Sequence, residues 1–328
     1  MEPFTAVLVF IASVFLLVKG AAWLIDNSSA IGRYLEISPI IIGLTIVAIG
    51  TSLPEFFVGI FAVLGGTADI SVGNIVGSNI ANIGLILGIA SIIYPLTIRE
   101  KTLINEFPFL LISGFMLLVL ANDNNIFGRD TFIISRFDGF LFLLTFLFFI
   151  SYLYRSMKFE HSRKKVEEEF KEEFGKKSKE IWKNAGMIAL GIASLGLGGK
   201  LIVNSGVDIA SALGVSEKFI GLTIVSLGTT LPELFTSVIA AIKKEADIAV
   251  GNILGSYIFN ILFVLGVIGV VRPYAAAPSL VYFDMVMMIA ITFMLLTFGV
   301  TKRRIDRHEG VILLVSYLAY ITYLVWTV

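Results

Sequence analysis

Two short segments of the chain place a glutamate and a proline inside long apolar stretches: GTSLPE at residues 50–55 and GTTLPE at residues 228–233. The proline of each segment has no amide hydrogen, and its ring clashes with the carbonyl four residues earlier. A helix therefore breaks there and releases backbone carbonyls. Released carbonyls and a carboxylate are unfavourable in lipid unless they face protein, water or ions. The pattern predicts two broken membrane helices whose carboxylates, Glu55 and Glu233, face a polar interior.

Polar groups accompany each glutamate at helical spacing, so that they fall on one face of a helix. Each copy offers released carbonyls and hydroxyls beside its carboxylate, and the next apolar stretch adds a serine and an asparagine four residues apart. In the first copy these residues are Ala48, Thr51 or Ser52, Glu55, Ser78 and Asn82. In the second copy they are Ser226, Thr229 or Thr230, Glu233, Ser256 and Asn260.

All of these groups are hard oxygen donors, and the sequence contains no cysteine. Oxygen ligands without thiolates or imidazoles suit Ca²⁺, which takes about 6–8 of them, and also Na⁺. Two glutamates carry a charge of about −2, which one Ca²⁺ neutralises, whereas an empty pair in low dielectric would take up protons. The donor set therefore predicts a site for Ca²⁺, several Na⁺ or H⁺ as transported ions, with no resident cofactor, and it favours exchange over leak.

The elements that must position these residues are membrane helices. The 328 residues are 57% hydrophobic and only 15% charged, whereas soluble domains average about 25% charged residues. Apolar segments of about 18 residues or more are long enough to cross a bilayer core. We therefore predict an all-α polytopic membrane protein with ten transmembrane helices. The predicted spans are 4–25, 38–64, 70–95, 103–121, 138–155, 184–204, 217–242, 248–271, 280–301 and 309–327.

The sequence also repeats itself. Residues 43–84 align without a gap with residues 221–262, and the matches include Gly, Pro, Glu, Asp and Asn. Each half holds five predicted spans, and an odd number makes the second copy enter the membrane in the opposite sense. In such inverted-topology repeats, substrate sites lie near the membrane midplane between the halves. The predicted organisation is a first five-helix repeat at 1–155, a linker at 156–183 and a second, inverted five-helix repeat at 184–328.

Lysine and arginine residues are divided unevenly between the two sides of this topology. The side that contains 156–183, with its run KKVEEEFKEEFGKKSKEI, carries most of them. Because basic residues are retained in the cytoplasm, we expect a multi-pass protein of the cell membrane with 156–183 in the cytoplasm and both termini outside. Two interpretations of 156–183 stay open, namely a solvated linker and a regulatory segment.

GTSLPE with GSNIAN, repeated as GTTLPE with GSYIFN, closely resembles the paired alpha-repeats of the calcium/cation antiporters, and the prokaryotic sodium/calcium exchangers are the nearest match. The resemblance implies ten helices in two inverted halves and the exchange of Na⁺ for Ca²⁺ by alternating access. It also implies that the first helix of each half, here Phe4–Ile25 and Asn184–Asn204, slides against the core. The ion ligands that it implies are Glu55, Thr51, Ser52, Ala48, Ser78, Asn82, Glu233, Thr229, Thr230, Ser226, Ser256 and Asn260.

One position distinguishes members within that family. Potassium-dependent members, and some prokaryotic relatives, have an aspartate where this chain has Asn260, and the asparagine favours potassium-independent exchange. Proton-coupled calcium exchangers carry a GNAxE-like first motif instead of GTSLPE, which favours Na⁺ coupling. The expected partners are therefore Ca²⁺, Na⁺ and the lipid bilayer, with no nucleic acid, and the chain is expected to function as a monomer.

Two alternatives stay open. The same two glutamates would also serve an H⁺/Ca²⁺ antiporter. A cation channel is an alternative of another class, because acidic rings line pores, although channels usually gain such rings by oligomeric symmetry and both copies here lie in one chain. An enzyme is not expected, since the chain has no G-x-S-x-G or H-E-x-x-H motif and no histidine in a predicted span.

Overall fold

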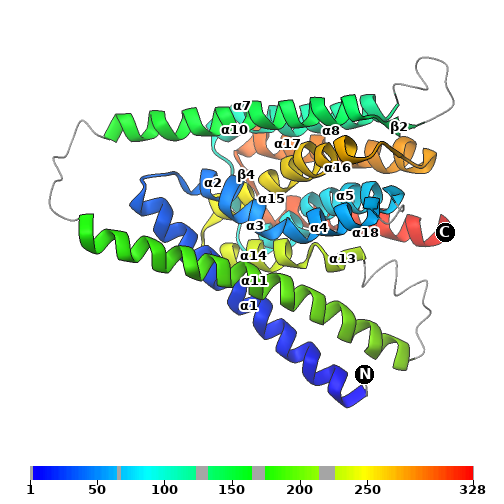
Figure 1. The fold of residues 1–328 in the computed structure, drawn as a ribbon, viewed down its shortest axis with the longest axis horizontal. Coiled ribbons are helices and arrows are strands. Elements are labelled where there is room, and N and C mark those ends of the chain that lie inside the picture. The colour runs from blue at the N-terminus through cyan, green and yellow to red at the C-terminus, as the bar shows by residue number, and fades with distance from the viewer. Residues whose placement is uncertain (1–2, 65–67, 123–131, 165–173, 214–225, 328) are drawn as a thin grey trace.

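The computed structural model is a bundle of long helices with two short two-stranded sheets (Figure 1). Among the described residues, eight helices are long and apolar enough to cross a membrane, and a bent helix pair forms a further span. The chain is therefore a multi-pass membrane protein. The described residues are 3–64, 68–122, 132–164, 174–213 and 226–327.

Several spans consist of consecutive helical pieces, of which those labelled η are π-helical. The elements of the first half are α1 (Pro3–Tyr34), α2 (Pro39–Ile42), η1 (Gly43–Val47), α3 (Ala48–Thr51), α4 (Leu53–Leu64), α5 (Ala68–Ala81), η2 (Asn82–Leu87), α6 (Gly88–Ile93), β1 (Leu96–Thr97), α7 (Glu100–Asn105), α8 (Phe107–Ala121), β2 (Ile133–Ile134) and α10 (Arg136–Lys164). Those of the second half are α11 (Phe174–Ala212), α13 (Ser226–Gly228), α14 (Leu231–Ile242), α15 (Ala246–Ile258), η4 (Phe259–Leu265), α16 (Gly266–Val271), β3 (Tyr274–Ala275), η5 (Leu280–Asp284), α17 (Met285–Lys302), β4 (Arg304–Ile305) and α18 (Arg307–Thr327).

The predicted all-helical membrane fold is confirmed, whereas the count of ten spans stays a prediction. All the predicted spans except 217–242 coincide with the eight long helices or the bent pair. The span at 217–242 is described only from Ser226 onward, as α13 and α14, and residues 217–225 lie outside the described part of the chain.

Two helices are longer than predicted. α1 continues past residue 25 to Tyr34, and α11 extends beyond 184–204 at both ends. The prediction followed the apolar stretches only, while a helix continues into polar sequence wherever its backbone hydrogen bonds are kept. α10 extends to Lys164 and α11 starts at Phe174, so the described parts of 156–183 are helical at both ends.

The first of the two predicted helix breaks is sharp. α3 ends at Thr51, Ser52 leaves the helix with φ −86° and ψ 7°, and α4 starts at Leu53. The two parts of the span are bent by 44°. In the second half, α13 ends at Gly228 and α14 starts at Leu231. Each new helix has its proline in the first turn, where a missing amide hydrogen is tolerated, and its glutamate directly after the proline.

Each small sheet joins a strand of one half to a strand of the other. β1 pairs with β4 in antiparallel fashion, with Leu96 opposite Ile305. β2 pairs with β3 in the same way, with Ile133 opposite Ala275. The two sheets lie toward opposite ends of the bundle (Figure 1). They tie the connecting segments of the two halves together at both ends.

α1 and α11 pack along each other and cross one side of the bundle obliquely (Figure 1). Their backbones meet at two glycines. A Cβ added to Gly20 would lie 2.9 Å from the carbonyl oxygen of Gly191, and one added to Gly191 would lie 2.9 Å from that of Gly20. Both helices also contact α14. The pair is a closely packed unit beside the second broken helix.

Candidate cation-binding site

Glu55 and Glu233 meet at the interface between the two halves. Both are 0% exposed, and they lie near enough for their charges to interact. Ser52 donates a hydrogen bond of 2.9 Å to one oxygen of Glu233, which connects the break of the first half to the carboxylate of the second. The hydroxyls of Ser78 and Thr229 lie beside Glu55. Among the described residues, both oxygens of Glu55 and the second oxygen of Glu233 nevertheless have no hydrogen-bond partner.

Hydroxyl groups of each half reach into the other half. The hydroxyls of Ser78 and Thr230 share a hydrogen bond of 3.2 Å. The hydroxyl of Ser256 donates to the carbonyl oxygen of Ala48 at 3.5 Å. Ala48 is the first residue of α3, its carbonyl was one of those predicted to be released by the break, and it is fully buried. The breaks are therefore surrounded by oxygen atoms from both halves.

Two asparagines that the sequence analysis did not single out hold the threonines of the breaks. Thr51 donates to Oδ1 of Asn252 at 3.0 Å, and Thr229 donates to Oδ1 of Asn74 at 3.2 Å. Asn252 also donates to Ser237 at 2.9 Å. Asn74 and Asn252 occupy matched positions of the repeated segment, and this shared identity is the signal that could have revealed them.

Asn82 and Asn260 lie in the π-helical segments η2 and η4. Such π turns are frequent at functional sites. Both asparagines are fully buried. Within the described part of the chain, neither amide atom of Asn82 has a partner, and Oδ1 of Asn260 has none either. The Nδ2 atom of Asn260 donates to Oδ1 of Asn79 at 3.3 Å.

The structure brings most of the predicted site residues together. Contacts link Ala48, Thr51, Ser52, Glu55, Ser78, Thr229, Thr230, Glu233 and Ser256. Asn82 and Asn260 lie on the π segments, with amide oxygens that have no partner among the described residues. The side chain of Ser226 lies outside the described part of the chain.

This arrangement suits a hard cation. Buried carboxylates without donors are unfavourable in a low-dielectric interior unless a cation or a proton neutralises them. The groups around them are neutral oxygens, and the described residues contain no cluster of three or more His, Cys, Asp or Glu side chains. A site with a small number of charged ligands binds a cation less tightly. The donor set therefore fits an ion that is bound and then released.

A cavity of 610 Å³ borders this site at Thr229. It is lined by the prolines of both breaks, by Thr229 and by the α11 segment from Ile192 to Asn204. Phe57 and Phe61 of α4 form another wall. The cavity therefore lies on the α4 side of the first break, between the broken helices and α11.

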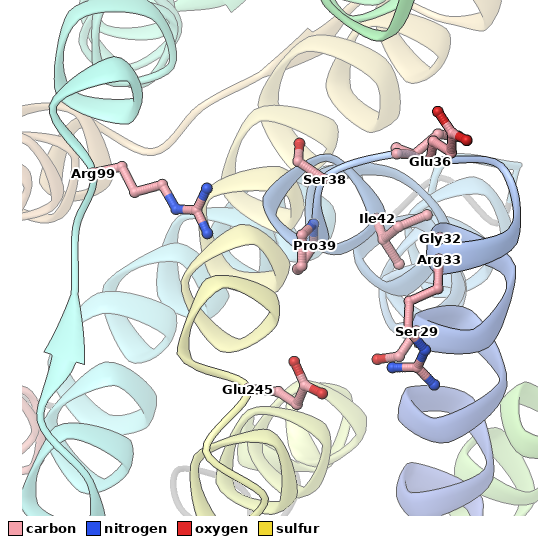
Figure 2. A pocket seen from close by; sticks show the side chains of 10 residues that line it. Ser29, Gly32, Arg33, Glu36, Ser38, Pro39, Ile42, Arg99 and Glu245 are labelled. Atoms are coloured by element: carbon pink, nitrogen blue, oxygen red, sulfur yellow. The ribbon is translucent and has the colours of Figure 1, made fainter. Parts of the chain in front are cut away.

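A second cavity, of 550 Å³, includes none of the predicted site residues and lies between the end of α1 and the start of α15. Figure 2 shows the Arg99 guanidinium and the Glu245 carboxylate pointing toward it from different elements. Nearby, Arg99 forms an ion pair with Asp247, and Lys243 forms one with Asp26 of α1. At this end of the molecule the Lys243–Asp26 pair connects α1 to the α14–α15 turn, and the Arg99–Asp247 pair connects the segment before α7 to α15.

Comparison with known proteins gives concordant results. The family model described as sodium/calcium exchanger protein matches residues 5–155 and 183–326. The chain is 37% identical to the putative antiporter CaxA of Alkalimonas amylolytica, covering 96% of this chain and 97% of that protein. It is 32% identical to the sodium/calcium exchanger MaX1 of Methanosarcina acetivorans, covering 97% of each. A solved structure of the sodium-calcium exchanger NCX_Mj, soaked with 10 mM Na⁺ and zero Ca²⁺, matches 98% of this chain and 99% of its own, with 30% identity and a TM-score of 0.81.

Proposed function

Because this chain belongs to the sodium/calcium exchanger family, we propose that it is a secondary antiporter that exchanges Na⁺ for Ca²⁺ across the cell membrane by alternating access, independently of K⁺. In this proposal both ions are substrates that share one site around Glu55 and Glu233. The further proposed ligands are Ala48, Thr51, Ser52, Ser78, Asn82, Ser226, Thr229, Thr230, Ser256 and Asn260.

The observation that carries this proposal is the pair of fully buried glutamates, whose oxygens are mostly unpartnered among the described residues. One Ca²⁺ or two Na⁺ would balance a charge of about −2. Either kind of ion satisfies the carboxylates, and an empty site leaves two buried charges uncompensated. Release of one ion therefore favours binding of the other, which supports exchange rather than leak.

The neutral side chain of Asn260 supports potassium independence. An aspartate at this position would raise the charge of the site to about −3, which would match Ca²⁺ together with one further monovalent cation. The asparagine adds an oxygen without a third charge. The same two glutamates also support H⁺/Ca²⁺ exchange as a second candidate, because carboxylates with few donors bind protons readily when they are buried.

The proposed topology has ten helices in two inverted halves, with both termini outside and 156–183 in the cytoplasm. The 610 Å³ cavity reaches Thr229 beside α4, and α4 ends on the side that the basic residues assign to the exterior. The ion pair between Lys243 and Asp26 lies on the opposite side. This combination describes an outward-open site that movement of α1 and α11 against the core would expose inward. Both copies of the motif lie in one chain, so one molecule suffices.

Uptake of ⁴⁵Ca²⁺ into proteoliposomes loaded with Na⁺, K⁺ or acid in turn tests this proposal. We expect uptake only from Na⁺-loaded vesicles, and we expect its loss in Glu55→Gln and Glu233→Gln, because each variant leaves a single charge for a divalent ion. Glu309→Gln is the matched control, since the buried Glu309 accepts a hydrogen bond of 2.8 Å from the amide of Asp306 away from the site. This control should retain uptake.

The alternatives give different results in the same experiment. Uptake from acid-loaded vesicles alone would replace Na⁺ coupling by H⁺ coupling through the same glutamates. Ohmic single-channel currents in planar bilayers would assign the protein to the channels. Normal Na⁺-driven uptake in both glutamine variants, with folding intact, would reject Glu55 and Glu233 as the ion-binding site.

A further inference from the structure

Asn260 is held by a chain of two buried amides. Its Nδ2 atom donates to Oδ1 of Asn79 at 3.3 Å, and Nδ2 of Asn79 donates to the backbone carbonyl oxygen of Tyr257 at 3.5 Å. All three residues are fully buried. Asn79 lies on α5 of the first half, whereas Tyr257 and Asn260 lie on α15 and η4 of the second. The chain of hydrogen bonds therefore crosses the interface between the halves.

The backbone carbonyl fixes the polarity of this chain. A carbonyl oxygen can only accept a hydrogen bond, so Asn79 turns its NH₂ group toward Tyr257 and its oxygen toward Asn260. Asn260 must then offer its own NH₂ group to that oxygen. Its Oδ1 points the other way and is buried without a partner among the residues that the structure describes. If either amide turned over, two acceptors or two donors would face each other.

Asn82, the equivalent of Asn260 in the first half, has no comparable support. The residue that matches Asn79 in the second half is Tyr257, whose hydroxyl instead accepts a hydrogen bond of 3.3 Å from Thr292. In the described ranges of the chain, both Oδ1 and Nδ2 of Asn82 are unpartnered. The two halves therefore treat their matched amides differently, and only that of Asn260 is oriented by a neighbour.

We propose that Asn79 is a positioning residue that makes Asn260 a permanent oxygen ligand of the transported cation. This inference rests on the proposed function, in which Asn260 binds ions. A cation is attracted by the amide oxygen and repelled by the NH₂ group. Holding the amide in one orientation therefore removes the states that cannot bind and lowers the ordering cost of binding. Asn79 touches no ion and acts only through Asn260.

Equilibrium binding of ⁴⁵Ca²⁺ to the purified full-length protein tests this proposal, with the apparent Ca²⁺ affinity of Na⁺-driven uptake as a second readout. We expect Asn79→Leu, which keeps the branching at Cγ and removes both polar groups, to weaken Ca²⁺ binding by about tenfold, as is typical of partners that orient metal ligands. In an Asn260→Ala background the same substitution should have no further effect, because the oxygen that Asn79 orients is gone.

Thr292→Val is the matched control. It removes a buried hydrogen bond to the hydroxyl of Tyr257 without touching the amide chain, so the Ca²⁺ affinity should stay unchanged even if the melting temperature falls. If Asn79→Leu does not give a monodisperse protein, Asn79→Ala makes the same comparison with a smaller side chain.

Three outcomes would overturn the inference. Equal losses of affinity on adding Asn79→Leu to the wild type and to Asn260→Ala would show that Asn79 does not act through Asn260. Unchanged affinity in Asn79→Leu, beside a loss in Asn260→Ala, would reject the role of Asn79 and leave the proposed site intact. Unchanged affinity in Asn260→Ala would remove Asn260 from the proposed site and reject both statements.

Discussion

Carboxylates inside the bundle occur at several places in the described part of the chain, and Glu55 differs from the others in having no hydrogen-bond donor on either oxygen. Glu106 accepts a hydrogen bond of 2.5 Å from Tyr152, and Asp284 accepts one of 2.8 Å from Tyr320. In each case a tyrosine of a neighbouring helix donates to one oxygen of the carboxylate, and the second oxygen of Glu106 has no partner among the described residues. Glu55 has no such donor among the described residues. Because buried polar groups are normally hydrogen-bonded, the exception at Glu55 points to a ligand rather than to packing.

At the same scale, Asn252 and Asn74 hold equivalent threonines but differ in a second hydrogen bond. Asn252 also donates to Ser237, whereas Nδ2 of Asn74 has no partner in the described ranges, and the position that matches Ser237 is Gly59. We expect Asn252→Ala to destabilise the ion-free protein by about 1–3 kcal/mol, because it leaves buried hydroxyls without their partner. Asn74→Ala should cost less. Denaturant unfolding of the two purified variants measures the difference, and equal losses would show that the bond to Ser237 contributes nothing.

The sequence reveals a site residue only where the residue type or its match in the repeat marks it. The glutamates and prolines could be predicted, because a membrane helix excludes both types unless something requires them. Asn74 and Asn252 carried a readable signal, since they match between the repeats. Asn79 carried none, because its matched residue is Tyr257 and its contact with Asn260 crosses between the halves. Spacing along one helix does not encode such a contact.

At the scale of elements, the crossing of α1 and α11 depends on Gly20 and Gly191. Alanine at either position would place its Cβ 2.9 Å from a backbone oxygen, so the helices would have to separate. Alanine otherwise stabilises a helix by about 0.5–1 kcal/mol relative to glycine. We therefore expect Gly20→Ala and Gly191→Ala to melt at lower temperature and to transport Ca²⁺ more slowly than the wild type.

Gly186→Ala is the control for this pair of variants. It lies on the same helix as Gly191, and no atom of the described residues lies within 4 Å of its added Cβ. Its melting temperature should be unchanged or higher, in line with the helix preference of alanine. If Gly20→Ala behaves like this control in both melting and transport, the close crossing of α1 and α11 does not exist in the membrane.

The elements themselves differ in how far residue type determines them. The break between α3 and α4 follows from Pro54, which the sequence displays. The π segments that contain Asn82 and Asn260 have no such mark, because an extra residue in a turn is held by packing between the halves rather than by composition. The full lengths of α1 and α11 were likewise missed, since their polar ends resemble loop sequence.

At the scale of the whole molecule, contacts between the halves come in matched pairs. β1 with β4 is mirrored by β3 with β2. The shift that aligns the repeats also carries the contact of Gly20 with Gly191 onto Gly198 with Ser13, where a Cβ on Gly198 would lie 3.2 Å from the Ser13 carbonyl oxygen. Paired contacts of this kind are expected if two similar halves are related by an axis in the membrane plane, and they support the proposed inverted repeat.

This inversion predicts that matched residues lie on opposite faces of the membrane. Thr97 on β1 and Ala275 on β3 are matched in the repeats and both are exposed. The chain contains no cysteine, so a single introduced cysteine reports only its own position. The basic residues place Thr97 in the cytoplasm and Ala275 outside. In intact cells, a membrane-impermeant maleimide should therefore label Ala275→Cys, and it should label Thr97→Cys only after permeabilisation. Labelling of both variants in intact cells would contradict the inversion. The reversed pattern would agree with the inversion but would reverse the predicted orientation of the molecule in the membrane.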